Sequence, residues 1–536
     1  MDVRRLRHFV FRVKKFLARI PNSVWLALLV LLAFAQVYFL RNVVMGDAFI
    51  HFVFARGIAD GQFFFYNGQF SAGSTSPFWS LLLAPVWKIF GMQIIWAVKI
   101  LASFFVALAI VLAFKFAEKI SSNRIAALAT AALLATNFVL PFWAAKGMET
   151  PLFVCLVLGS FLVYLELVNP PAKSTSSSLT PQISGELTLG LILGVAILTR
   201  PEAWFLTAFL GIGLLAQKKW RALLTVGLPT ALIFAPYYFW LFANTGSIFP
   251  STIARILRAR QWAHEFGGIF FTLEIPKILV TKFLPLTPFF LLFFFYKPVN
   301  PPPRWWVNSS ISYPIFAWLA FHAIFFSVIF PTTEGYRYIL AALPFFYLIS
   351  ILGVFRLPKK WQTPILVLVL LGSLLISGQQ FLERRASIAS CEQPFLDQAR
   401  RDVGLWLEEN TPTDSLIALK EVDQSAFFGE RRMLSLDGTL DARAIPFVQS
   451  GDQLQFLKNE RPNFFVLEEE MYREYPAWKK SNVLSLADAN LKIGDTKILD
   501  GVSFTLRAKL KSGDPKSCSN FSSDYFWWIF AVKFTP

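Results

Sequence analysis

Long apolar runs alternate with short polar segments from Trp25 to Ile376. Each run approaches the ~20 residues that an α-helix needs to cross the hydrocarbon core of a bilayer. After Phe381 the pattern changes to mixed apolar and charged residues. The pattern therefore predicts two domains, a polytopic α-helical transmembrane domain over residues 1–380 and a second domain over residues 381–536.

We predict about eleven transmembrane helices in the first domain. They cover residues 24–40, 94–117, 125–140, 151–167, 187–199, 203–217, 221–242, 277–296, 311–330, 337–355 and 362–377. The two runs beside Arg200-Pro201-Glu202 are short, so they form either one broken helix or two tilted helices, and we predict two. The first run also resembles a signal peptide with a cleavage site at Ala33-Phe34-Ala35, but it continues to Leu40, which favours retention.

Residues 77–90 are apolar as well, but a crossing there would reverse the orientation of everything that follows. We expect an interfacial helix in the first external loop instead, anchored at the membrane surface by Trp79, Trp87 and Lys88.

Composition agrees with a membrane protein, because 55% of the residues are hydrophobic and only 16% are charged. The net charge of +17 does not indicate a nucleic-acid partner, since Lys and Arg cluster in short segments between the apolar runs. Such clusters mark cytoplasmic loops. The basic N-terminus is therefore expected in the cytoplasm of a plasma (inner) membrane protein, and an odd number of spans places the second domain outside.

The second domain is predicted to be an extracytoplasmic α/β unit. An amphipathic helix is expected over residues 397–410, and strands over residues 415–419, 432–436, 464–467, 497–499 and 502–510. Cys391 and Cys518 lie near its two ends and could form a disulfide in an oxidising compartment. Cys155 falls within a span, where it is expected to pack as a small residue.

Acidic and basic residues gather in the external segments of this topology. The acids of interest are Asp47, Glu149 and Glu202, and the bases are Arg56, Lys146, Arg200 and Arg337. Solvated loop residues and structural ion pairs are the plain alternatives, the latter above all for Glu149 and Glu202. Beside an apolar helix, however, an ionised side chain is costly unless it has a partner or lines a polar cavity. The sequence has no Cys/His cluster, so we expect no cofactor and no metal, with dependence on a divalent metal left open.

The external segments also contain a series of motifs. The first loop has Gly46-Asp47-Ala48-Phe49, Ala55-Arg56-Gly57, Asp60-Gly61, Tyr66-Asn67-Gly68 and Gly73-Ser74-Thr75-Ser76-Pro77-Phe78-Trp79; later come Gly147-Met148-Glu149-Thr150-Pro151-Leu152, Thr199-Arg200-Pro201-Glu202, Tyr336-Arg337-Tyr338 and Gly404-Leu405-Trp406-Leu407-Glu408-Glu409-Asn410-Thr411-Pro412. In this order they resemble the motifs of GT-C glycosyltransferases, which use polyprenyl-phosphate sugars. The nearest resemblance is to the branch of the mycobacterial terminal arabinofuranosyltransferase. Many relatives have Asp-Asp where this chain has Gly46-Asp47, and often His-Arg-Tyr where it has Tyr336-Arg337-Tyr338.

The resemblance implies transfer of a monosaccharide from a polyprenyl-phosphate donor to an extracytoplasmic glycan or glycolipid, with inversion at the anomeric carbon. A sugar hydroxyl needs a base to remove its proton, and Asp47 is the candidate. The leaving phosphate needs cations, for which Arg56, Arg200, Arg337 and Lys146 are candidates. His51 lies one helical turn from Asp47, on the same face of a helix. Together with Glu149, Glu202 and Trp79 it completes the candidate site.

Two other classes of function stay open. Charged residues within a membrane domain can mark the path of a lipid or glycan transporter or flippase. The acids here gather at one face and not at mid-span, which favours the transferase. A non-catalytic scaffold of cell-envelope glycan assembly is the third hypothesis.

Overall fold

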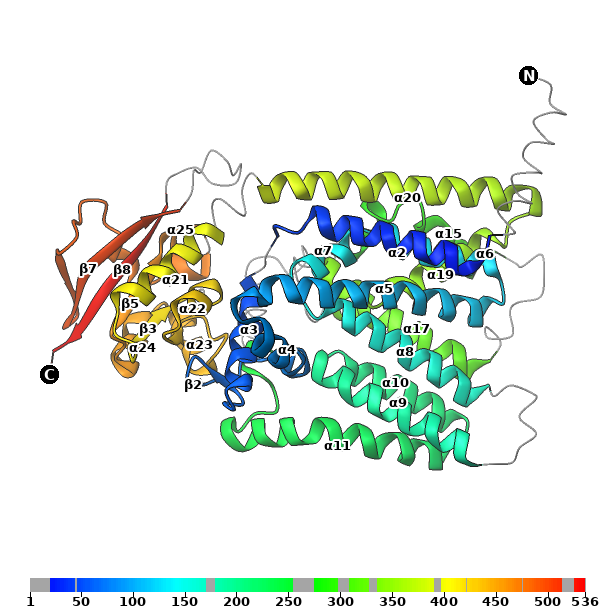
Figure 1. The fold of residues 1–536 in the computed structure, drawn as a ribbon, viewed down its shortest axis with the longest axis horizontal. Helices are drawn as coiled ribbons and strands as arrows, with labels where there is room; N and C mark the ends of the chain where they lie inside the picture. The colour runs from blue at the N-terminus through cyan, green and yellow to red at the C-terminus, as the bar shows by residue number, and fades with distance from the viewer. Residues whose placement is uncertain are drawn as a thin grey trace, which may run out of the picture.

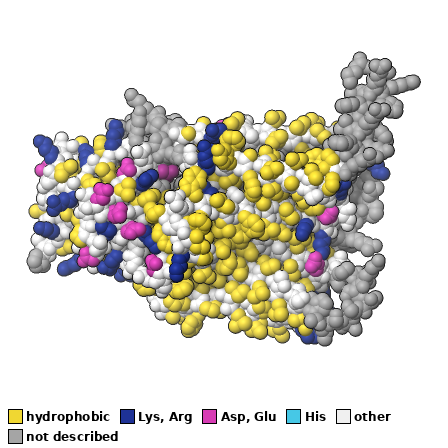
Figure 2. Space-filling view, in the orientation of Figure 1, with side chains coloured by type: hydrophobic (Ala, Val, Ile, Leu, Met, Phe, Trp, Pro, Cys, Tyr) yellow, Lys and Arg dark blue, Asp and Glu magenta, His cyan; other side chains and the backbone are white. Residues whose placement is uncertain are grey.

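The computed structural model describes residues 20–43, 46–169, 179–253, 274–296, 308–326, 335–389, 397–420, 422–474, 476–512 and 525–535. Figure 1 shows an elongated bundle of helices with a sheet-containing domain at one end. In Figure 2, hydrophobic side chains cover much of the bundle, whereas many charged side chains lie on the sheet domain. This distribution is typical of a membrane domain joined to a domain in water.

Within the described part of the chain, and leaving aside α3 and α4, the bundle contains ten helices of twelve or more residues. They are α2 (Asn22–Phe39), α5 (Ile94–Ser121), α6 (Arg124–Thr136), α8 (Thr150–Val168), α9 (Leu179–Thr199), α10 (Ala203–Ala216), α11 (Trp220–Thr245), α17 (Ser309–Ile324), α19 (Leu343–Val354) and α20 (Lys359–Ser387). Shorter pieces are α7 (Val139–Ala145), α14 (Glu274–Thr281), α15 (Thr287–Phe295) and α18 (Gly335–Ile339). Among the described residues, five helical stretches are long and apolar enough to cross a membrane, or six if the bent pair α6 and α7 forms one span. The count of about eleven spans stays a prediction.

Three segments predicted as single helices are interrupted. Residues 277–296 form α14 and α15, with Pro285 in the turn between them, and proline cannot donate the backbone hydrogen bond that would continue a helix. Residues 337–355 divide into α18 and α19, the latter with a proline in its first turn. Residues 125–140 divide into α6 and α7 with a bend of 47°. At this bend the Asn137 side chain accepts a hydrogen bond from the backbone of Val139 at 2.9 Å.

The basic segments 115–124, 218–221 and 356–360 lie at the end of the bundle opposite the sheet domain (Figure 1). The two ends of the bundle therefore differ as the charge pattern predicts. Placement of the basic end in the cytoplasm stays a prediction.

The segment between α2 and α5 forms α3 (Gly46–Ala59), a short hairpin of β1 (Phe65–Tyr66) and β2 (Gln69–Phe70), and α4 (Pro77–Phe90). α3 and α4 pack together between the bundle and the sheet domain (Figure 1). A separate helix over residues 77–90 was predicted and is present, followed by the 3-10 turn η1 (Gly91–Gln93). The predicted surface position of Trp79 is wrong. Its side chain is fully buried, because the indole packs inside the loop and its Nε1 donates to the Gly147 carbonyl at 3.2 Å.

The sheet domain has a six-stranded sheet in the order β4-β3-β5-β8-β7-β6. Its strands are β3 (Leu416–Leu419), β4 (Arg432–Ser435), β5 (Phe464–Glu468), β6 (Thr496–Leu499), β7 (Val502–Lys511) and β8 (Phe526–Phe534); β4, β3 and β5 are parallel and the other pairs antiparallel. Its helices are α21 (Gln398–Asn410), α22 (Gln424–Gly429), α23 (Ile445–Ser450), α24 (Gln453–Glu460), α25 (Glu469–Glu474) and α26 (Pro476–Lys479), with 3-10 turns η4 (Ala442–Ala444) and η5 (Leu484–Leu486). The predicted helix and all five predicted strands are confirmed, whereas β8 was missed.

One hydrophobic core extends from the bundle through α3 to one face of the sheet, where it includes Ile417 and Val466. The neighbouring residues Ala418 and Phe465 belong to a second core. Because successive side chains of a strand point to opposite faces, the sheet separates the two cores. The sheet domain thus shares a core with the bundle, and the predicted boundary at residue 380 falls inside α20, which ends at Ser387.

Candidate active site

A network of charged side chains lies where several helices of the bundle end. Asp47 is in the first turn of α3, Glu149 directly precedes α8, Arg200 and Glu202 lie between α9 and α10, and Arg337 is on α18. These segments are separated by up to 290 positions in the sequence, yet ion pairs join them. The structure therefore brings together five of the residues selected from the sequence.

Arg337 links Asp47 to Glu149. Its Nη1 lies 3.1 Å from Asp47 Oδ2, and its Nη2 lies 3.1 Å from Glu149 Oε1. Only 8% of the Arg337 side chain is exposed, compared with 46% of the Asp47 side chain. Asp47 is consequently the most exposed member of the network, with the Arg337 guanidinium behind it.

Arg200 extends the network away from Asp47. Its Nη1 donates to Glu149 Oε1 at 2.6 Å, and its Nη2 donates to Glu202 Oε1 at 2.7 Å. The guanidinium also lies over the Tyr338 ring, with Cζ 4.8 Å from the ring centroid. Arg200 is therefore held by two carboxylates and an aromatic face, a setting that suits a buried guanidinium.

Glu149 is the carboxylate shared by both arginines, and its side chain is 1% exposed. Burial alone would raise its pKa, but the charges of Arg337 and Arg200 lower the pKa to about 2. Glu149 is thus ionised at any physiological pH. It holds the two guanidinium groups close to each other despite their like charges.

His51 lies one turn after Asp47 on α3 and contacts the same network. Its Nε2 is 3.6 Å from Glu149 Oε2, and its Nδ1 is 3.3 Å from Ser80 Oγ in α4. Burial lowers the pKa of His51 below its ordinary 6.5, so the ring is neutral at pH 7. In the tautomer that carries its proton on Nε2, the ring would turn its N–H toward Glu149 and would accept the Ser80 hydroxyl on Nδ1.

The backbone at Gly147 explains how Glu149 comes so near to α3. Gly147 has φ +80°, and a Cβ there would lie 3.2 Å from Val98 Cγ1 and 3.5 Å from Ala48 Cβ. Glycine alone adopts this left-handed conformation without strain and leaves room for the close approach. The hydrogen bond from Trp79 to the Gly147 carbonyl fixes the turn from the other side. Trp79 therefore supports the site from behind.

Lys146 and Arg337 share an aromatic neighbour. The Lys146 amine lies 5.1 Å from the centroid of Trp143, and Arg337 Cζ lies 5.0 Å from the same ring. Lys146 is buried, with 7% of its surface exposed. Both cations therefore contact the Trp143 ring, and the role of Lys146 as a phosphate ligand stays a prediction.

Arg56 is the predicted site residue that the structure places elsewhere. It follows Asp47 by nine positions on α3, which at 100° per residue puts the two side chains on opposite faces of the helix. Arg56 pairs with Glu430, and its Nη2 donates to Asn67 Oδ1 at 2.7 Å. It joins α3 to the sheet domain and lies outside the network around Asp47.

The network carries three carboxylates, from Asp47, Glu149 and Glu202, against two guanidinium groups. With His51 neutral, its net charge is −1, and Lys146 nearby brings the balance to zero. Within the described part of the chain, no group of three His, Cys, Asp or Glu residues is arranged to hold a metal ion.

The predicted disulfide lies outside the described residues, since Cys391 and Cys518 are in segments 390–396 and 513–524. Cys155 is a buried free thiol.

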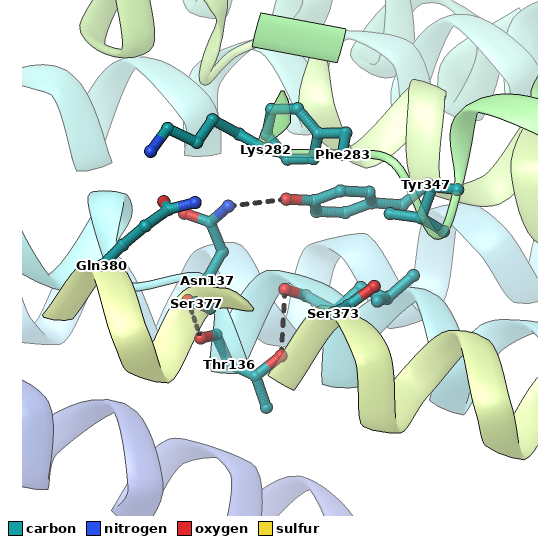
Figure 3. Close-up of a pocket in the computed structure, with 10 residues that line it drawn as sticks. Thr136, Asn137, Lys282, Phe283, Tyr347, Ser373, Ser377 and Gln380 are labelled. Atoms are coloured by element: carbon teal, nitrogen blue, oxygen red, sulfur yellow. Dashed lines mark hydrogen bonds between the residues drawn. The ribbon is translucent and has the colours of Figure 1, made fainter. Parts of the chain in front are cut away.

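A small polar cavity lies at the other end of α7 (Figure 3). Asn137 donates to the Tyr347 hydroxyl at 2.8 Å, and Ser377 donates to the Thr136 carbonyl at 2.7 Å. Lys282 and Gln380 also line the space. At about 20 Å³ the cavity has room for about one or two water molecules, so it accommodates no sugar or lipid head group.

No protein-family model and no curated protein sequence matches the chain. Solved structures share its fold. The structure of ArnT from Cupriavidus metallidurans bound to undecaprenyl phosphate matches with a TM-score of 0.58 and 14% identity, over 95% of this chain and 97% of that chain.

Two structures of the Archaeoglobus fulgidus oligosaccharyltransferase match as well, each at 13% identity. The complex with Zn and sulfate has a TM-score of 0.59 over 86% of this chain and 70% of that chain. The form tethered with an acceptor peptide containing the NVT sequon has a TM-score of 0.54 over 96% and 74%. At these identities the comparisons show that the chain shares the fold of ArnT and of this oligosaccharyltransferase.

Proposed function

We propose that the protein is a membrane glycosyltransferase that transfers a monosaccharide from a polyprenyl-phosphate donor to a glycan or glycolipid outside the cytoplasm. The observation that carries the proposal is the half-exposed Asp47 beside a buried pair of arginines, at the end of a GT-C-like bundle. ArnT, which shares the fold, was crystallised with undecaprenyl phosphate.

Asp47 is the proposed base. It pairs with Arg337 and is the most exposed carboxylate of the network, so an acceptor hydroxyl can approach it. Removal of the hydroxyl proton as the new bond forms to the anomeric carbon makes the oxygen a competent nucleophile. Displacement in a single step inverts the configuration at that carbon.

The ion pair between Asp47 and Arg337 couples the two halves of this reaction. Before reaction, the carboxylate neutralises the guanidinium at 3.1 Å. When Asp47 takes up the acceptor proton it loses its charge, and Arg337 then has one carboxylate partner fewer. Its positive charge becomes available while negative charge develops on the leaving polyprenyl phosphate. Base and phosphate ligand thus act together.

Arg337 is the proposed first ligand of the donor phosphate, assisted by Lys146 across the Trp143 ring. Arg200 pairs with both Glu149 and Glu202, so we assign it mainly to holding the network. Arg56 is bound to Glu430 and Asn67, so we do not assign it to the donor phosphate. The sequence resemblance to the arabinofuranosyltransferase branch makes a polyprenyl-phosphate arabinofuranose one candidate donor.

The experiment uses the purified protein in proteoliposomes with synthetic decaprenyl-phosphate monosaccharides, including the arabinofuranosyl, mannosyl, glucosyl and galactosyl forms. Native membranes supply the acceptor. The proposal predicts that one donor yields free decaprenyl phosphate and a new glycosidic bond of inverted configuration. A flippase would instead move the intact donor across the bilayer, and a scaffold would release no decaprenyl phosphate; either result from the whole panel would contradict the proposal.

A further inference from the structure

A short segment of the sheet domain lies along α3, the helix that carries Asp47. In the middle of this contact, the Phe427 ring packs against Phe49 and Phe52, with centroid separations of 5.1 and 5.9 Å. Phe427 and these two residues are buried in the core that bundle and sheet domain share. α22, to which Phe427 belongs, is thus a packing partner of α3 and not part of a separate module.

The C-terminal end of α3 is tied to the same segment by polar contacts. Arg56 pairs with Glu430, just after α22. Asn67, in the hairpin after α3, donates to the carbonyls of Ala426 and Arg431 at 2.8 and 2.9 Å. Residues 426–431 are therefore fixed against the end of α3 that is remote from Asp47.

The N-terminal end of α3 meets Asp423, the residue before α22. A Cβ built on Gly46 would overlap Asp423 Oδ2 and lie 3.0 Å from Asp423 Cγ. The Asp423 carboxylate thus fills the space that a side chain at position 46 would take. Gly46 directly precedes Asp47, so this carboxylate abuts the backbone that holds the proposed base.

Asp423 is itself rigidly held. It is 4% exposed, its Oδ1 accepts a hydrogen bond from the backbone of Gln424 at 2.6 Å, and its Oδ2 lies 3.1 Å from Arg400 Nη1. Arg400 also approaches Glu468 of β5 at 3.7 Å, which ties the pair to the sheet. A fixed carboxylate at this end also complements the partial positive charge at the N-terminus of α3.

From this geometry we infer that Asp423 is a positioning residue for Asp47: the sheet domain seats its carboxylate in the gap left by Gly46 and so fixes the first turn of α3. The inference rests on the proposed function for its consequence in catalysis. It assigns the sheet domain a part in the active site, because a carboxylate that acts as a base must be held within a fraction of an ångström of its productive place. It also accounts for glycine at position 46.

The first test measures amide hydrogen exchange of the full chain in peptides covering residues 46–52 and 53–59, which requires no substrate. Asp423→Ala is expected to speed exchange in residues 46–52 at least about fivefold while residues 53–59, held by Arg56 and Asn67, change little. Gly46→Ala should act in the same direction because its methyl group displaces the carboxylate. Gly227→Ala in α11, where a Cβ would meet nothing within 4 Å, is the matched control. Unchanged exchange over residues 46–52 in both variants would overturn the inference.

Two double variants test the same contact through catalysis. One is part of a double-mutant cycle, and the other moves the carboxylate from position 423 to position 46. With the donor that the wild type uses, Asp423→Ala is expected to lower kcat between about 10- and 100-fold while KM for the donor stays within about threefold. The loss in Gly46→Ala/Asp423→Ala should equal that of Asp423→Ala alone, since the methyl group then has room. Gly46→Asp/Asp423→Ala returns a carboxylate to the gap and should recover at least tenfold in kcat over Asp423→Ala. If the Asp423→Ala variant does not fold, Asp423→Asn replaces it in these kcat measurements.

The two proposals can fail separately. If Asp423→Ala and Asp423→Asn keep kcat within about twofold of the wild type while Asp47 variants are inactive, the positioning role is refuted and the proposed function stands. If the wild type transfers no sugar from any donor but the exchange pattern is as expected, the proposed function fails and the structural role of Asp423 stands.

Discussion

Glu149→Gln tests the charged network most sharply, because Glu149 is the carboxylate shared by both arginines. The substitution keeps the size of the side chain and removes its charge. Among the ion pairs of the described network, Arg200 would then keep its pair with Glu202, and Arg337 would keep its pair with Asp47. Removing one partner of a buried ion pair leaves an uncompensated charge in a poorly solvated place.

The expected cost follows from the pKa of Glu149. A pKa lowered from 4.5 to about 2 stabilises the folded state by about 3 kcal/mol when the carboxylate is ionised. Because the pKa is lower in the folded state, this contribution is complete above about pH 4.5 and is lost as the pH falls through about 2. Measured losses of one partner from a buried ion pair, about 3–5 kcal/mol, agree in size.

Reversible unfolding by dodecyl sulfate in mixed micelles, followed by tryptophan fluorescence, gives the free energy of unfolding at pH 7 and pH 3. Glu149→Gln should lower it by about 3 kcal/mol at pH 7, and about half of this cost should remain at pH 3. Glu166→Gln is the matched control, since Glu166 is 63% exposed and pairs with Lys119 at the other end of α8. That surface pair should contribute less than about 1 kcal/mol.

A cost for Glu149→Gln no greater than that of Glu166→Gln would show that the charge of Glu149 does not stabilise the network. So would a cost that is the same at pH 7 and pH 3, because it would then come from shape and not from charge.

Two further substitutions probe the parts of the site that hold Asp47 and Glu149. Arg337→Lys replaces a fork that reaches both carboxylates with a single ammonium, so kcat for transfer should fall at least about tenfold in steady-state assays, and an unchanged kcat would remove Arg337 from the mechanism. Gly147→Ala should lower the free energy of unfolding by at least about 1 kcal/mol more than Gly61→Ala, because both glycines have positive φ but only Gly147 faces crowded neighbours. Equal costs would contradict the close approach at Gly147.

Much of the fold follows from local sequence pattern. The apolar runs predict the positions of most bundle helices, and the change of pattern after residue 380 predicts the sheet domain. The helix breaks could not be predicted from hydropathy alone. Pro285 and the side-chain hydrogen bond of Asn137 interrupt helices within apolar runs that are continuous in hydropathy. β8 was missed because its residues, FWWIFAVKF, are apolar on both faces and show no alternation.

The site was predictable in its residues but not in its connections. Asp47, Glu149 and Arg200 were selected because charge beside an apolar helix needs a partner, and Glu202 and Arg337 because they lie in the motifs of the family resemblance. The structure pairs these five residues with one another. From the sequence, Arg56 could have been excluded, because nine residues of helix after Asp47 place its side chain on the opposite face.

Ser80 and Asp423 gave no local signal, because nothing in their own segments indicates a contact with α3. The Ser80 hydroxyl meets His51 across 29 positions, and Asp423 meets Gly46 across a far longer stretch of chain. Such contacts depend on tertiary packing, here the shared core of bundle and sheet domain, which the sequence pattern does not encode locally.

Whether Asp47 is the base of a glycosyl transfer is tested by the rate of that transfer in the Asp47→Asn variant. The substitution keeps the shape of the side chain and removes its ability to accept a proton. The rate should fall about 100- to 10,000-fold. Asp60→Asn, at an exposed position just after the same helix, should stay within about twofold of the wild type. A folded Asp47→Asn protein that retains more than half of the wild-type rate would contradict the account.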